Sequence, residues 1–140
     1  MKEQALQIAK SLEQIPGVVA KYMPNSSRYK LMSRSGVIWN RESRGTDYPK
    51  WGNVHYHTNH VMVVLDYPNG RYTEEQFSQC LKLPVINSRE RRTGFYICRD
   101  PEGPFDSLRV KLCDDDAKNE DLIAALLPVA RDIYKLAAGI

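Results

Sequence analysis

The chain has 140 residues, 42% of them hydrophobic and 26% charged, which is the size and composition of one folded domain spanning residues 1–140. Its longest apolar stretches, residues 61–65 and 122–130, are much shorter than the roughly 20 residues that a membrane helix needs. The first residues lack the apolar segment of a signal peptide, and the three cysteines form no CxxC pair. We therefore expect a cytoplasmic protein with no membrane partner and no disulfide framework.

The formal net charge of +3 hides an asymmetry along the chain. Residues 1–99 carry 15 Lys and Arg against 8 Asp and Glu, a balance of +7, whereas residues 100–140 carry 5 against 9, a balance of −4. A basic body permits binding to a polyanion. The same asymmetry also permits the acidic end to dock on the basic part of the same chain, so charge alone leaves both interpretations open.

The hydrophobic pattern predicts helices at both ends and in the middle of the chain, separated by strands. Residues 3–15 have apolar side chains at helical spacing, and Thr73-Glu74-Glu75-Gln76 matches a capping box that begins a helix over residues 74–82. Asn119 is a suitable N-cap for a last helix ending near residue 137. Strands are predicted at residues 17–23, 28–33, 36–40, 54–65, 93–99 and 105–113, and a polar loop at 41–53.

Short turns between the predicted strands favour an antiparallel sheet. Within residues 105–113 the side chains alternate, and this alternation places leucine and valine on one face and Arg109, Lys111 and Cys113 on the other. The fold prediction is therefore α+β: a mostly antiparallel sheet of about five to six strands, with the N-terminal, middle and C-terminal helices packed on one face.

All three histidines lie in the segment His55-Tyr56-His57-Thr58-Asn59-His60. Neutral imidazoles bind zinc, manganese and other divalent metals, so His55, His57 and His60 are candidate metal ligands. A hairpin turning at residues 58–59 would put all three on one face, whereas a continuous strand would turn His60 away from the other two. Because Thr-Asn is not a preferred two-residue turn, we predict the continuous strand. Histidines that bind no ion, or that act as an acid, a base or a phosphate contact, are the alternatives.

Two short family motifs resemble this segment. Its spacing is similar to the HxHxDH motif of metallo-β-lactamase-type hydrolases, with Asn59 in place of the aspartate, and those enzymes have a larger αββα sandwich with further ligands downstream. The first three residues resemble the HUH box of rolling-circle replication and transposition nucleases, whose nucleophile is a helical tyrosine, often in a Y-x-x-K motif. Here Tyr134 is followed directly by Lys135. Both resemblances are confined to residues 55–60, and either would imply metal-dependent hydrolysis.

Basic and aromatic residues are interleaved in two other segments. Residues 89–99 join an arginine-rich turn to a strand with aromatic side chains, and residues 28–51 carry six Lys and Arg against two Asp and Glu. Arginines in a turn contact phosphates, and an exposed aromatic ring stacks on unpaired bases. The candidate nucleic-acid-binding residues are Arg41, Arg44, Lys50, Trp51, Arg89, Arg91, Arg92 and Tyr96.

Three classes of function are compatible with these patterns. The leading hypothesis is a small module whose basic, aromatic-interleaved face binds DNA or RNA, mainly through phosphate. The alternative is a metal-dependent hydrolase or nuclease centred on the three histidines, with zinc or manganese as cofactor and Asp66 as a carboxylate helper. The third is a non-catalytic subunit or inhibitor that binds a protein partner or a second copy of itself, since the sequence contains no complete catalytic motif.

Overall fold

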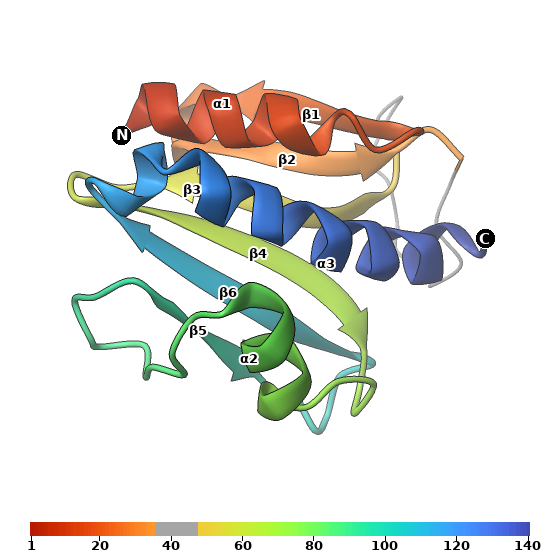
Figure 1. The fold of residues 1–140 in the computed structure, drawn as a ribbon. Helices are drawn as coiled ribbons and strands as arrows, with labels where there is room; N and C mark the ends of the chain where they lie inside the picture. Colours follow the sequence, from red (N-terminus) through yellow and green to blue (C-terminus); the bar gives the residue numbers. More distant parts are fainter. Residues whose placement is uncertain (36–47) are drawn as a thin grey trace.

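A six-stranded antiparallel sheet forms one layer of this computed structural model, and α-helices form the other (Figure 1). Residues 1–35 and 48–140 are described. The strand order is β1-β2-β3-β4-β6-β5. The strands are β1 (Val18–Met23), β2 (Arg28–Ser33), β3 (Lys50–Tyr56), β4 (His60–Pro68), β5 (Gly94–Cys98) and β6 (Phe105–Cys113). The α-helices are α1 (Lys2–Leu12), α2 (Glu74–Leu81) and α3 (Glu120–Ala138). A short 3₁₀ turn, η1 (Pro24–Ser26), joins β1 to β2, and another, η2 (Asp116–Lys118), joins β6 to α3. The α+β prediction is confirmed.

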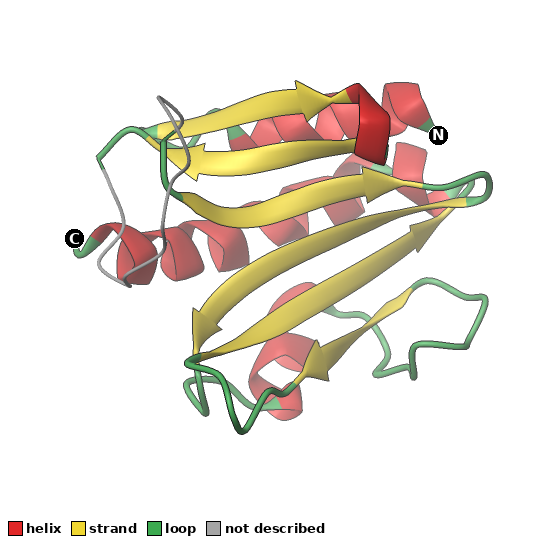
Figure 2. Ribbon diagram, turned by 180° about the vertical axis from the view of Figure 1, so that it is seen from behind, coloured by secondary structure: helices red, strands yellow, loops and turns green. Residues whose placement is uncertain are grey.

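The three α-helices all lie on one face of the sheet (Figures 1 and 2). Their apolar stripes pack on the alternate residues of the strands, and together they form the core, which includes Ile8, Leu65, Phe95, Leu108 and Ile133. None of the α-helices in the described ranges lies on the other face of the sheet, which we call the open face (Figure 2). Each strand therefore sends every second side chain into the core and the others toward this open face.

Local sequence signals account for the helix ends. The Thr73 side chain accepts from the Gln76 backbone N–H, and the Gln76 side chain accepts from the Thr73 N–H, so the capping box is confirmed. Asn119 caps α3 by accepting from two backbone N–H groups, and Gly139 ends the helix in the left-handed region at φ 74°. In the described ranges, no helix combines the length and the apolar character that crossing a bilayer requires.

The predicted continuous strand over residues 54–65 is wrong, because the chain turns between β3 and β4. The His57 N–H donates to the His60 carbonyl at 2.9 Å, and Val54 pairs with Val63. Val54 and Tyr56 before the turn and Val61, Val63 and Leu65 after it all pack in or against the core, so one straight strand would send one of these two sets out of the core. Burying both sets outweighs the weak turn preference of Thr-Asn. Residues 50–53, predicted as loop, belong to β3, and the strand predicted at 36–40 lies outside the described residues.

Asp106 connects two loops at the end of the sheet where β4 ends and β6 begins. This side chain is 4% exposed, and its carboxylate accepts from Asn69 Nδ2 at 2.9 Å, from the Gly70 N–H at 2.9 Å and from the Asp100 N–H at 3.3 Å. Hydrogen bonds to a charged acceptor are stronger than neutral ones, and these three bonds join the turn at Asn69 and Gly70 to Asp100. Asp106 therefore has a structural role.

Asp106→Ala should lower the free energy of unfolding by about 2 kcal/mol, because three hydrogen bonds to a buried carboxylate are lost. Urea unfolding followed by circular dichroism measures this change. Asp115→Ala, at an exposed carboxylate of the same charge, is the matched control and should change stability by less than about 0.5 kcal/mol. Equal losses in the two variants would contradict the structural role of Asp106.

Candidate nucleic-acid interface

Strand register aligns the side chains of the open face in rows that cross the sheet. Directly opposed residues of antiparallel strands lie on the same face, so each row can be followed from strand to strand. The first row is Lys21, Lys30, Asn53, Val64, Arg109 and Tyr96. The second row is Met23, Arg28, His55, Met62, Lys111 and Gly94. Both rows cross all six strands.

Positive charge is concentrated on this open face. In the described strands its basic residues are Lys21, Arg28, Lys30, Lys50, Arg109 and Lys111, and its one carboxylate is Asp66. Neighbouring strands lie about 4.8 Å apart, so these cations repel one another. The alternation of Arg109 and Lys111 with buried leucine and valine was visible in the sequence. That both rows continue across β1, β2 and β3 depends on pairing between strands and was missed.

His55 lies in the second row, between Arg28 and Met62. Its pKa is lowered from 6.5 to about 4, first by burial and then by the positive charges of Arg28, His57, Lys50 and Arg109. The imidazole is therefore neutral at neutral pH. A neutral ring within a cationic face offers a flat surface and hydrogen-bonding nitrogens without adding charge.

The other two histidines lie at the hairpin turn and contact each other. The rings of His57 and His60 are stacked, with their centroids 4.4 Å apart and their planes at 18°. The Oδ1 atom of Asn59 accepts from Nδ1 of His60 at 2.8 Å, which assigns the proton of the neutral ring to Nδ1. Burial, His57 and Lys111 lower the pKa of His60. Among the described residues, no group of three His, Cys, Asp or Glu side chains is arranged to hold a metal ion.

A loop rich in arginine, residues 87–92, lies beside the open face, and we call it the arginine loop. The Nζ atom of Lys111 donates to the Glu90 carbonyl at 2.7 Å, which joins β6 to this loop. Within the loop, Asn87 Oδ1 accepts from the N–H groups of Arg89 and Glu90 at 3.0 and 3.1 Å, and Glu90 Oε2 accepts from the Asn87 N–H at 2.9 Å. These reciprocal bonds hold the loop backbone in one conformation.

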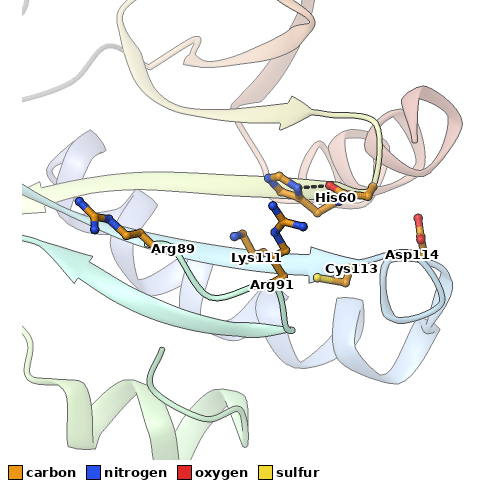
Figure 3. A pocket seen from close by; sticks show the side chains of 7 residues that line it. His60, Arg89, Arg91, Lys111, Cys113 and Asp114 are labelled. Atoms are coloured by element: carbon orange, nitrogen blue, oxygen red, sulfur yellow. Dashed lines mark hydrogen bonds between the residues drawn. The ribbon is translucent and has the colours of Figure 1, made fainter. Parts of the chain in front are cut away.

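A cleft of about 410 Å³ opens where the arginine loop approaches β4 and β6 (Figure 3). Its lining residues are Asn59, His60, Arg89, Arg91, Lys111, Cys113 and Asp114. Arg91 and Lys111 extend toward the imidazole of His60, whereas the Asp114 carboxylate lies apart from these cations (Figure 3). The fold thus brings together the histidine segment and the arginine-rich segment, which the sequence analysis treated as separate candidates.

Trp51 was predicted as an exposed stacking residue, and this prediction is wrong. Its side chain is 0% exposed, and its ring centroid lies 5.1 Å from that of Tyr134 on α3. The register passes from Gly52 opposite Leu31 to Lys50 opposite Met32, so Trp51 is the extra residue of a β-bulge. Burying an indole against the helices is more favourable than leaving it in water.

The other predicted residues differ in their positions. Lys50 is half-buried on the open face, and Tyr96 is half-buried opposite Arg109 at the edge strand β5. Arg92 does not line the cleft, and it lies 3.5 Å from the Glu90 carboxylate. The remaining two, Arg41 and Arg44, lie outside the described residues. Four basic residues of the open face were not predicted as site residues: Arg28, Lys30, Arg109 and Lys111.

No protein-family model, no curated protein and no solved structure matches this chain at a significant level. A function is therefore inferred from the charge and geometry of the open face and its cleft. These features belong to one continuous surface, because Lys111 lies both in the second row and in the cleft.

His55→Gln should make stability less sensitive to acid. His55 titrates near pH 4 in the folded protein and near its ordinary value of 6.5 in the unfolded chain, so the unfolded chain binds more protons between these values. The free energy of unfolding therefore falls as the pH falls from 6.5 to 4, and the His55 contribution is fully present above pH 6.5. Urea unfolding of the wild-type protein and of His55→Gln, at several pH values between 6.5 and 4, measures how the free energy of unfolding of each depends on pH.

The matched control for this experiment is His57→Gln, at an exposed histidine two residues along the chain. It should retain most of the fall in stability on acidification. If His55→Gln and the wild-type protein lose stability in parallel between pH 6.5 and 4, the assignment of the acid sensitivity to His55 is wrong.

Proposed function

We propose that this protein binds single-stranded nucleic acid along the open face of its sheet. The observation that supports this most directly is the set of six basic residues on one face that none of the described α-helices covers. Phosphate contacts by lysine and arginine provide most of the affinity of proteins for nucleic acids, because they release counterions. A polyanion laid across the rows would also relieve the repulsion between their cations.

The lack of any described α-helix on the open face favours a single strand over a duplex (Figure 2). A duplex is usually read by a helix or a ribbon that enters a groove, and the described α-helices all lie behind the sheet (Figure 2). Unpaired bases instead stack on aromatic or planar side chains exposed on a sheet. Tyr96 in the first row and the neutral His55 in the second row supply such groups next to Arg109 and Arg28.

The double variant Lys21→Gln/Lys30→Gln should weaken binding and reduce its dependence on salt. Each lost phosphate contact lowers the slope of log affinity against log salt by about 0.7, so the double variant should lose about 1.4. Fluorescence anisotropy with labelled single- and double-stranded DNA and RNA, at about 50 and 200 mM salt, measures both effects. The wild-type protein should prefer the single strands.

Arg131→Gln/Lys135→Gln removes the same charge from exposed positions of α3, on the opposite side of the sheet, and is the matched control. If it weakens binding as much as the open-face variant does, only net charge matters and the proposed interface is wrong. A preference for duplexes would contradict the single-strand proposal.

Repeating the titrations with zinc or manganese tests the nuclease hypothesis, in which anisotropy would fall as the probe is cut. No binding to any probe would favour a protein partner instead.

A further inference from the structure

The cleft at the margin of the open face contains more positive charge than contact with one internal phosphate requires. Arg89, Arg91 and Lys111 line it together with His60 (Figure 3). We propose that this cleft is a subsite for a phosphate monoester, the group found at a phosphorylated strand end. This inference rests on the proposed function and deepens it, because the subsite would select strands by the chemistry of their ends.

The charge of the cleft suits a monoester better than a diester. An internal phosphodiester carries one negative charge, whereas a monoester carries about 1.5 to 2 at neutral pH and has three acceptor oxygens. The guanidinium group of Arg91 can form paired hydrogen bonds to such oxygens, and the ammonium group of Lys111 adds a compact charge. Arg89 adds a further positive charge, although it extends away from both (Figure 3). The volume of about 410 Å³ lies in the usual range of small-ligand pockets, about 300 to 1,000 Å³.

Nearby carboxylates are placed so that they do not neutralise the cleft. The carboxylate of Glu90 is engaged within the arginine loop, where Oε2 accepts from the Asn87 N–H and Oε1 lies 3.5 Å from Arg92. Asp114 lines the cleft, but its carboxylate lies apart from Arg91 and Lys111 (Figure 3). The positive charges of the cleft are therefore available to an anion.

The arginine loop is also ordered before any ligand arrives. Its backbone is held by the hydrogen bonds between Asn87 and Glu90 and by the bond from Lys111 Nζ to the Glu90 carbonyl. At its end, Thr93 Oγ1 donates to Asp116 and accepts from the Cys113 N–H at 3.0 Å. Because this order exists in the free protein, less conformational entropy is lost when an anion binds.

The position of the cleft fits the end of a bound nucleic-acid strand rather than its middle. Lys111 belongs both to the second row of the open face and to the cleft lining. A nucleic-acid strand that follows the row therefore reaches the cleft directly. His60 and Cys113, paired across β4 and β6, lie at the last register position of these strands. Beyond them the chain leaves the sheet, at the β3–β4 turn and at η2.

The test compares short single-stranded oligonucleotides that differ only in a terminal phosphate, at the 5′ end or at the 3′ end, with the label on the opposite end. The wild-type protein should bind one phosphorylated form about tenfold more tightly than the unphosphorylated form. Arg91→Gln should remove this preference. Arg92→Gln, the same change at an arginine of the same loop that does not line the cleft, should retain it. Lys21→Gln/Lys30→Gln should weaken binding of the phosphorylated and the unphosphorylated oligonucleotides by the same factor.

The outcomes separate the inference from the proposed function. If the wild-type protein binds all three oligonucleotides equally and the open-face variant still weakens binding, the monoester subsite is wrong and the proposed function stands. Inorganic phosphate is tested alone through the width of its phosphorus NMR signal. If no oligonucleotide binds but the protein broadens this signal and Arg91→Gln abolishes the effect, the cleft is a site for free phosphate and the proposed function is wrong. If neither binds, both are wrong.

Discussion

The placement of the described α-helices on one face of the sheet determines which side chains can meet in this protein. Because strand residues alternate between faces, burying one set under the helices leaves the other set on the open face. Lysine and arginine are rarely buried without partners, so they occupy the open set. The hydrophobic effect thus places the basic residues of the described strands on a single surface. No attraction between the cations is needed to bring them together on this face, and their mutual repulsion opposes this arrangement.

The positive charge of this surface also contributes, after burial, to the pKa shifts of two histidines. The pKa of His55 falls to about 4 because the ring is partly buried and lies near Arg28, Lys50 and Arg109. Burial and Lys111 also lower the pKa of His60. Burial disfavours any charge on these rings, whereas the smaller coulombic contributions reflect a positive local potential, which favours an anion. Binding of a polyanion would remove part of the cost that folding incurs on this face.

Lys111 connects the sheet to the arginine loop. Its ammonium group is held by the Glu90 carbonyl, and the residue is only 7% exposed. A buried cation with a hydrogen-bond acceptor is stable, whereas the same cation without one would be costly. The bond therefore fixes the loop beside β6 and at the same time keeps a positive charge at the base of the cleft. Loop position and site charge consequently depend on the same interaction.

The sequence by itself determined the helices, the caps at Thr73 and Asn119, the alternation in β6 and the α+β class, because these depend on neighbours along the chain. Turn preference favoured one continuous strand over residues 54–65, whereas the tertiary structure has a hairpin there. Only the tertiary structure decided that Trp51 is buried and that His60, Arg91 and Lys111 share a cleft. Those outcomes depend on a bulge and on the order β4-β6-β5, in which β6 pairs with both neighbours. Pairing between distant segments is selected by burial of the whole core, and no local pattern specifies it.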